Sequence, residues 1–316
     1  MKIFAINPGS TSTKVALFED DQKLFSKSVS HEASKLDEFA TISDQLPYRL
    51  ETIQSALDEA GFTLDDVDAF VGRGGGLLAC EGGVYEIDDL VFAHAQAGQN
   101  GVQHPAQLGP QLAHHFAVKY GKPGYVVNPP DTDELQDVAR MTGIKGIYRI
   151  IHLHALNLKE TAIRHAASMG KKYNECNFVV CHIGGGISIS AHRQGRMIDG
   201  YDIVGGEGPM APTRVGAVSV HNIALYLEQG HTVDDLKKLN TKTGGMVNHV
   251  GISDAMELRD REAAGDKEAA MVWATMLYQI NKSIGAMAAA LEGKVDAILL
   301  GGGMVHDDDL VAVKTP

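Results

Sequence analysis

Cysteine and tryptophan are scarce in this chain of 316 residues, which contains three cysteines and one tryptophan. The cysteines, Cys80, Cys176 and Cys181, form neither a CxxC pair nor an even-numbered set. This pattern excludes a disulfide framework and fits reduced thiols in a cytosolic protein.

Long apolar runs and an excess of positive charge are also missing. No apolar run is long enough to span a bilayer, and the first residues contain no signal-peptide core. The 40 acidic residues outnumber the 28 basic ones, for a net charge of −12, which argues against a general nucleic-acid binder and against docking on anionic membranes. With 44% hydrophobic residues, the composition predicts a cytoplasmic globular protein of two domains, in which local donors bind any anion.

The most strongly patterned stretch is residues 3–18, where one apolar run enters a turn rich in Gly, Ser and Thr and a second run leaves it. This pattern predicts a β-hairpin at the edge of a buried sheet. Gly9 would let N–H groups approach an anion, and the turn adds polar donors from Asn7, Ser10, Ser12, Thr13 and Lys14. We interpret it as a phosphate-binding hairpin, with an ordinary polar hairpin as the alternative. It is not a Walker A loop, because the GxxxxGK[ST] spacing is absent.

Arg73 follows a short apolar run at residues 68–72 and precedes three glycines. Ligands of open α/β sheets bind at the carboxyl ends of strands, so this position predicts an anion-binding arginine. A solvated arginine in a flexible turn is the alternative. A second arginine, Arg214, stands in an irregular segment rich in Gly and Pro.

Acidic residues follow a predicted strand at 124–127, in a turn that contains Asn128, Asp131 and Asp133. Carboxylates at this point could hold Mg²⁺, which prefers oxygen ligands and is commonly shared with nucleotide phosphates. Capping of the next helix by Asp133 is an equally weighted alternative.

Two histidines stand at predicted helix entries. His104 opens a helix that runs to residue 120, and its ring is placed to face a cleft. His152 and His154 alternate in an extended segment, so at most one of them faces a site. We choose His154, because the polar Asn157 follows it by one helical turn.

The plan of the first hairpin returns at residues 178–191, where an apolar run meets three glycines and an alternating strand follows. A third glycine turn at 301–303 could lie flat against a purine or ribose. Two such hairpins in separate halves predict a duplicated architecture with a nucleotide held between the halves. Because this hairpin pattern occurs again in the second half of the chain, the sequence predicts domains at 1–148 and 149–316.

The remaining elements are predicted from apolar periodicity and glycine stops. In chain order they are a strand at 23–30, helices at 46–60, 104–120, 134–142, 155–169, 217–229 and 266–291, and a strand at 295–300.

The three glycine turns together resemble the nucleotide loops of the acetate and sugar kinase, Hsp70 and actin superfamily. Within it, an ordered set of motifs is similar to the acetokinase family: Asn7-x-Gly9-Ser10-x-Ser12-x-Lys14, Arg73, His104, the 128–134 turn, His154-Ala-Leu-Asn157, His182-Ile-Gly-Gly-Gly and Thr213-Arg214. The motifs at 71–75, 154–157 and 300–303 are closest to the butyrate kinase branch. The resemblance covers essentially the whole chain.

This resemblance implies an α/β fold of two ribonuclease-H-like domains with an interdomain nucleotide cleft. It implies reversible phosphorylation of a short-chain carboxylate such as butyrate, using ATP and Mg²⁺, by a homo-oligomer; a branched-chain fatty acid, acetate or propionate is the alternative substrate. The implied catalytic residues are Arg73, His104, His154 and Arg214. The implied nucleotide-binding residues are Asn7, Ser10, Ser12, Lys14, His182, Gly184, Gly185, Gly186, Ser188, Gly301, Gly302 and Gly303. The implied metal ligands are Asn7, Asn128, Asp131 and Asp133.

The chemistry of such a reaction agrees with the residues present. A carboxylate nucleophile is already ionised near neutral pH, so the protein must align groups and neutralise charge. Arg73 and Arg214, one in each half, would supply the fixed cations that phosphoryl transfer requires.

Two features depart from the family pattern. Asn128 stands where a carboxylate is usual, so we expect Asp131 or Asp133 to substitute, or the role to be lost. The family normally continues beyond the last glycine turn; we therefore expect residues 307–309 to form a solvated loop, the adenine pocket to be incomplete, an apolar face to be exposed and activity to be reduced. Two other functions stay open: a kinase of hydroxyl groups with Asp131 or Asp133 as base, and a catalytically weak nucleotide-binding regulatory protein.

Overall fold

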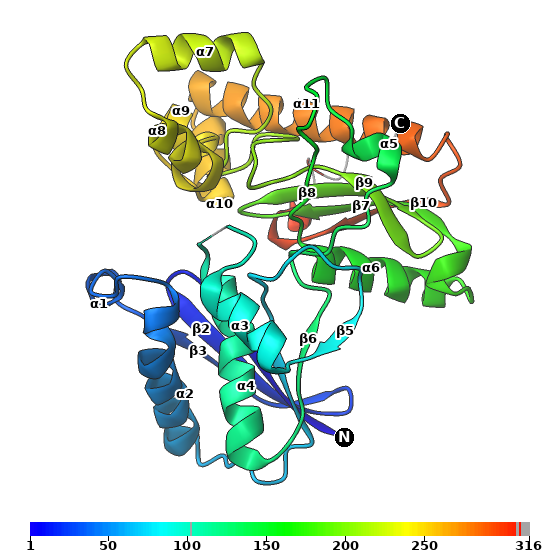
Figure 1. Cartoon of the computed structure of the whole chain (residues 1–316). Helices are drawn as coiled ribbons and strands as arrows, with labels where there is room; N and C mark the ends of the chain where they lie inside the picture. Colours follow the sequence, from blue (N-terminus) through cyan, green and yellow to red (C-terminus); the bar gives the residue numbers. More distant parts are fainter. Residues whose placement is uncertain (102, 308–309, 311–316) are drawn as a thin grey trace. The chain divides into compact units, whose positions relative to one another are not determined.

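The computed structural model describes residues 1–101, 103–307 and 310. The chain divides into two compact units, Met1–Thr132 and Asp133–Pro316, and each contains one mixed β-sheet with helices packed on it (Figure 1). The predicted α/β class is confirmed. Among the described residues, no helix combines the length and apolarity needed to cross a membrane.

The sheet of the first unit has the order β3-β2-β1-β4-β6-β5. Its first three strands form an antiparallel meander, β4 pairs in parallel with β1, β6 pairs in parallel with β4, and β5 pairs antiparallel with β6. The hairpin and the third strand predicted from alternation are confirmed. The strands are β1 (Lys2–Pro8), β2 (Ser12–Glu19), β3 (Gln22–Ser30), β4 (Ala69–Gly72), β5 (Val84–Glu86) and β6 (Gly124–Val127).

Helices of the first unit pack on this sheet through an aromatic core in which Phe4, Phe70 and Phe116 meet with ring centroids 5.8–6.2 Å apart. The two longest helices end at left-handed Gly61 and Gly121, as predicted from the glycine stops. The helical segments are α1 (Ala33–Leu36), η1 (Ser43–Gln45), α2 (Leu46–Ala60), α3 (Asp89–Ala97), η2 (Pro105–Gln107) and α4 (Leu108–Tyr120).

The sheet of the second unit repeats the plan of the first. Strands β7 (Asn177–Ile183), β8 (Ile187–Arg193) and β9 (Arg196–Gly200) form an antiparallel meander, and β10 (Ala297–Gly301) pairs in parallel with β7. The order β10-β7-β8-β9 therefore matches β4-β1-β2-β3. The duplicated architecture, with a glycine turn after the first strand of each sheet, is confirmed.

Two helices cover opposite faces of this second sheet, α6 (Ala155–Ser168) on one and α11 (Lys267–Ala290) on the other (Figure 1). Side chains along β7 alternate between the two faces of the sheet. Phe178 and Val180 belong to the core on one face, and Val179, Cys181 and Ile183 belong to the core on the other. The remaining helical segments are α5 (Asp137–Arg140), η3 (Tyr173–Glu175), α7 (Val220–Glu228), α8 (Val233–Lys238), η4 (Leu239–Thr243), α9 (Met246–Val250), α10 (Ala255–Ala263) and η5 (Gly303–His306).

Two helix predictions need correction. The helix predicted at 134–142 is wrong, because only Asp137–Arg140 is helical and its N-cap is Gln136, so Asp133 caps nothing. The Gln136 N–H donates to Ile198 O at 3.0 Å, which keeps the segment before α5 extended along β9. The helix predicted from 217 begins at Val220, because the Ser219 side chain caps it. Residues 308 and 309 of the predicted solvated loop lie outside the described residues.

Candidate active site

The turn between β1 and β2 presents backbone donors to its surroundings. The Gly9 N–H donates to Ser12 O at 2.7 Å and closes the turn, while Asn7 and Lys14 are exposed and directly opposite in the hairpin register. In the part of the chain that the structure describes, the N–H groups of Ser10 and Thr11 have no hydrogen-bond partner. Such outward N–H groups form the concave arrangement that binds anions.

A buried arginine from α2 lies beneath this turn. Arg49 is 0% exposed, and its Nη1 donates to Gly9 O at 3.0 Å and to Thr13 Oγ1 at 2.9 Å. Its Nε and Nη2 donate to Gln45 Oε1 at 3.1 and 2.8 Å, and desolvation lowers the pKa of the guanidinium to about 10. Arg49 was not among the residues predicted from the sequence. The signal was a cation four residues before Ile53, on the apolar face of the predicted helix.

Arg73 leaves the carboxyl end of β4, and its N–H donates to Ile6 O at 2.8 Å. The glycines on either side of Arg73 let the backbone pack closely against the start of α4. A Cβ on Gly72 would lie 2.9 Å from Pro110 N, and a Cβ on Gly74 would collide with Ala106 O. No described residue forms a hydrogen bond or ion pair with the Arg73 guanidinium, and burial lowers its pKa. A partly desolvated guanidinium without a protein anion is suited to a bound anion.

His104 is the N-cap of η2, and its Nδ1 accepts a hydrogen bond from the Ala106 N–H at 3.1 Å. The cap fixes the ring at the start of the helical segment that also packs on Gly74. Its position at a helix entry was predicted, and its role in catalysis stays a prediction.

The carboxylates proposed to hold a metal are engaged by protein donors. Asp131 is 2% exposed; its Oδ1 accepts from Asn100 Nδ2 at 2.6 Å and its Oδ2 from the Leu77 N–H at 3.2 Å. Asp133 forms a bidentate ion pair with Arg140 at 2.7 and 2.8 Å. Within residues 1–101, 103–307 and 310, no group of three or more His, Cys, Asp or Glu side chains is placed to hold a metal ion.

The second unit brings together three predicted residues at the glycine turn. The rings of His154 and His182 stack with centroids 4.0 Å apart, and Ser188 Oγ lies 2.8 Å from His154 Nδ1. Ser188 Oγ also accepts from the His154 backbone N–H at 3.2 Å, so its hydroxyl hydrogen is free to point at Nδ1. In that neutral tautomer, Nε2 of His154 carries the proton and is a donor. Ser188 therefore orients His154, a relation that the sequence analysis missed.

The glycines of the second unit permit contacts that side chains would prevent. Gly302, at φ 100°, lies so close to Ile183 that a Cβ would sit 2.7 Å from its backbone nitrogen. A Cβ on Gly186 would lie 3.1 Å from Cζ of Arg214. The turn after β7 is thus flanked by the turn after β10 and by the second arginine.

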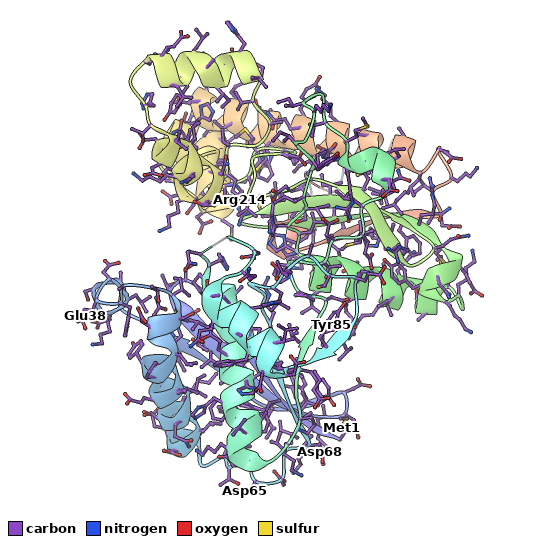
Figure 2. The ribbon with its side chains drawn as sticks, viewed as in Figure 1. Met1, Glu38, Asp65, Asp68, Tyr85 and Arg214 are labelled. Carbon is purple, nitrogen blue, oxygen red and sulfur yellow. The ribbon has the colours of Figure 1, made fainter. Side chains whose placement is uncertain are left out.

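Arg214 is labelled in Figure 2, in the irregular segment between β9 and α7. Its Nη1 donates to Ile203 O at 3.0 Å, whereas its buried Nε has no hydrogen-bond partner among the described residues. Burial lowers the pKa of this guanidinium, and the nearby Asp202 opposes the shift. A half-buried cation with an unused N–H next to a glycine turn is suited to a bound anion.

Ion pairs formed by Arg149 hold the segment that leads to Arg214. Arg149 donates to both carboxylate oxygens of Glu207 at 3.0 Å and to Asp199 Oδ1 at 3.1 Å. These bonds raise the pKa of Arg149. The Glu207 carboxylate also accepts from the Asp202 N–H at 3.0 Å. No local sequence signal marks these ion pairs, because their members come from separate segments.

Comparisons with known proteins agree with this geometry. A probable butyrate kinase from Elusimicrobium minutum is 40% identical over 323 residues, covering 98% of this chain and 87% of that protein. Butyrate kinase 2 from Clostridium acetobutylicum is 36% identical over 317 residues, covering 99% and 89%. The profile of the acetokinase family matches residues 141–314. The chain belongs to the acetokinase family.

This membership confirms the family resemblance read from the sequence, and with it the enzyme class, a kinase. Solved acetokinase-family structures share the fold. An acetate kinase from Porphyromonas gingivalis superposes with a TM-score of 0.79 at 21% identity, over 99% of this chain and 86% of that one. A propionate kinase from Francisella tularensis does so with a TM-score of 0.78 at 19% identity, over 99% and 86%.

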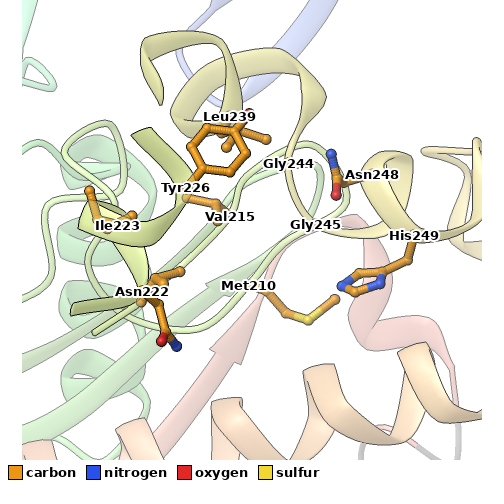
Figure 3. Close-up of a pocket in the computed structure, with 11 residues that line it drawn as sticks. Met210, Val215, Asn222, Ile223, Tyr226, Leu239, Gly244, Gly245, Asn248 and His249 are labelled. Carbon is orange, nitrogen blue, oxygen red and sulfur yellow. The ribbon is translucent and has the colours of Figure 1, made fainter. Parts of the chain in front are cut away.

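A pocket of about 220 Å³ is lined in part by the segment of this acetokinase-family chain that contains Arg214 (Figure 3). Its lining includes the apolar side chains of Met210, Val215 and Ile223 and the polar side chains of Asn248 and His249. None of the residues predicted to bind nucleotide or metal is among the described residues that line it.

Proposed function

We propose that this chain transfers the terminal phosphoryl group of ATP to the carboxylate of a short-chain fatty acid, with butyrate as the first candidate. The observation that carries the proposal is Arg214, a half-buried guanidinium whose buried Nε–H is unused, against the glycine turn of the second unit. The names of the similar proteins from Elusimicrobium minutum and Clostridium acetobutylicum support butyrate, and those of the solved structures leave acetate and propionate as alternatives.

The reaction joins a carboxylate oxygen to the terminal phosphorus and breaks the bond from that phosphorus to the bridging oxygen of ADP. The carboxylate needs no general base, because it is ionised at neutral pH. Negative charge spreads over the oxygens of the transferring group, so Arg73 and Arg214 would act by charge neutralisation. His154, held by Ser188 in the tautomer with Nε2–H, would donate to the same group.

Nucleotide phosphates are proposed to bind at two glycine turns. The β1–β2 turn would contribute Asn7, Ser10, Ser12 and Lys14. The β7–β8 turn would contribute Gly184, Gly185 and Gly186. Gly301, Gly302 and Gly303 after β10 would approach the nucleoside. His182 donates through Nδ1 to Asn157 Oδ1 at 2.8 Å, which leaves its Nε2 near Gly184.

Mg²⁺ would accompany the nucleotide and help to neutralise its phosphates. The carboxylates of Asp131 and Asp133 do not fit as open ligands, because protein donors already engage both oxygens of each. The amide oxygens of Asn7 and Asn128 remain the proposed protein contacts to the hydrated ion. The same engagement disfavours the alternative of a hydroxyl kinase, which needs a free carboxylate as base. A homo-oligomeric state and a cytoplasmic location also stay proposals.

Hydroxylamine trapping of acyl phosphate tests the function. The chain would be incubated with Mg·ATP and, in separate reactions, acetate, propionate, butyrate, valerate or isobutyrate. We expect butyryl hydroxamate as the main product and a loss of about 100-fold or more in Arg214→Lys, because lysine cannot reproduce the guanidinium fork. Arg164→Lys, at an exposed position of α6, is the matched control and should retain full activity. ATP binding with no hydroxamate from any acid would favour the regulatory alternative.

A further inference from the structure

Arg49 is a buried charged residue that the proposed reaction does not use. We infer that it is a positioning residue for phosphate binding: from beneath the β1–β2 turn it holds carbonyl groups inward, directs N–H groups outward and supplies positive charge. This inference rests on the proposed role of that turn in holding phosphate groups.

The peptide groups of the β1–β2 turn point in defined directions around Arg49. Arg49 Nη1 donates to Gly9 O at 3.0 Å and to Ser12 O at 3.4 Å, so these carbonyls point toward the helix. The peptide between Gly9 and Ser10 is trans, because the described chain contains no cis peptide bond. The Ser10 N–H therefore points away from Arg49. One side of the turn presents oxygens to the guanidinium, and the other presents donors to a ligand.

The positive charge of Arg49 is surrounded by neutral acceptors. All acceptors of Arg49 in the described structure are neutral: Gly9 O, Ser12 O, Thr13 Oγ1 and Gln45 Oε1. The neighbouring His31, whose Nε2 lies 2.8 Å from Thr13 Oγ1, adds no negative charge. A buried cation without a counter-ion is costly. An anion on the outer side of the turn would offset that cost.

The neutral residue beside Arg49 distinguishes a role in phosphate binding from a purely structural role in the turn. A cation that only held carbonyl groups would be more stable beside a carboxylate, and position 45 is placed for one. Gln45 is 5% exposed and receives two hydrogen bonds from Arg49. Gln45→Glu is nearly isosteric and keeps both bonds, but it neutralises the charge beneath the turn.

The test measures binding of ADP with Mg²⁺ by calorimetry, without turnover, together with thermal unfolding. We expect Gln45→Glu to bind ADP about 10-fold more weakly at low salt while unfolding at the same or a higher temperature. Arg49→Met should lose at least as much affinity, whereas Arg49→Lys should stay within about fivefold of the wild type because it keeps the charge. Gln54→Glu, which makes the same change of charge farther along α2, where Gln54 contacts Lys119, is the matched control and should stay within about twofold.

Two results would overturn the inference. One is Gln45→Glu binding ADP as tightly as the wild type. The other is Gln54→Glu losing as much affinity as Gln45→Glu, which would show that added negative charge anywhere on α2 weakens binding. If Arg49→Met does not fold, the comparison of Gln45→Glu with Arg49→Lys still decides. A wild-type chain that binds ADP but forms no acyl hydroxamate would defeat the proposed reaction and leave the role of Arg49 to be judged from binding.

Discussion

The imidazole rings of His154 and His182 stack with their centroids 4.0 Å apart and their planes inclined by 22°. The two residues come from different elements, the N-cap of α6 and the end of β7. Ser188 holds His154 from one side, and Asn157 holds His182 from the other. The two hydrogen bonds and the stack help to fix both rings, and this arrangement leads to two predictions.

Replacing His182 should separate stacking from hydrogen bonding. His182→Phe keeps a flat ring against His154, whereas His182→Ala removes both the ring and the bond to Asn157. We expect kcat for hydroxamate formation to fall about 10-fold in His182→Ala and less in His182→Phe, because a misplaced donor weakens transition-state stabilisation. Equal losses in the two variants would show that the hydrogen bond to Asn157, not the stack, holds the site.

Ser188→Ala should lower kcat with little change in the KM for ATP. Without the hydroxyl, Nδ1 of His154 can carry the proton and Nε2 ceases to be a donor, which we expect to cost about 10- to 100-fold in kcat. Steady-state kinetics with varied ATP measure both constants. A raised KM with an unchanged kcat would instead support the contact of Ser188 with nucleotide that the family resemblance implies.

Gly186→Ala should displace Arg214 without unfolding the second unit. Its new Cβ would lie 3.1–3.3 Å from three atoms of the guanidinium group, which must shift by a few tenths of an ångström or more. We expect kcat to fall about 10-fold and the unfolding temperature to change little. Gly285→Ala in α11, where a Cβ meets nothing within 4 Å, is the control and should keep activity and gain slight stability. An unchanged kcat in Gly186→Ala would mean that Arg214 moves freely.

Lys159 and Glu134 form a buried ion pair at 2.9 Å, with side chains 6% and 3% exposed. Lys159→Met removes the cation paired with the buried Glu134 carboxylate, which still accepts from the Met197 N–H, and we expect a loss of about 3–5 kcal/mol in the free energy of unfolding. Urea denaturation measures it. The double variant Lys159→Met with Glu134→Gln should recover part of the loss, and equal stability of the single and double variants would contradict the explanation.

The stability of the chain should fall as the pH is lowered from about 6.5 toward 3. Burial, with a smaller contribution from Lys159, lowers the pKa of His192 to about 3, and burial with Arg49 lowers that of His31 to about 4. Below about pH 6.5 these two histidines bind protons in the unfolded chain but stay neutral in the folded chain. Each histidine therefore contributes up to about 1.4 kcal/mol per pH unit to the slope of the unfolding free energy against pH.

His192→Gln tests the larger of the two contributions. Tyr173 Oη and Ser190 Oγ lie 2.6 and 2.8 Å from the ring nitrogens of His192, and an amide can keep one of these bonds. The slope of unfolding free energy between pH 4.5 and about 6.5 should be shallower in the variant than in the wild type, by at most about 1.4 kcal/mol per unit. Parallel slopes would show that His192 is protonated in the folded chain.

Local pattern was sufficient to predict most of the elements. Apolar alternation marked both hairpins, and Gly61 and Gly121 marked helix ends, since these signals depend on neighbours within one or two turns. The helix at 134–142 failed for the opposite reason. Gln136 bonds to Ile198, a residue far along the chain, and this contact keeps the backbone extended where local propensity favours a helix.

The groups of the candidate site could be predicted from their order along the chain, because two glycine hairpins, Arg73, His154 and Arg214 follow an order typical of the acetokinase family. The fold, not the order of residues, establishes how these groups are held. It placed Arg49 beneath the first turn, Ser188 on His154, and protein donors on Asp131 and Asp133. Spacing along a chain specifies a residue's element and face, but burial and hydrogen-bond partners arise where distant segments meet, so a single sequence leaves them undetermined.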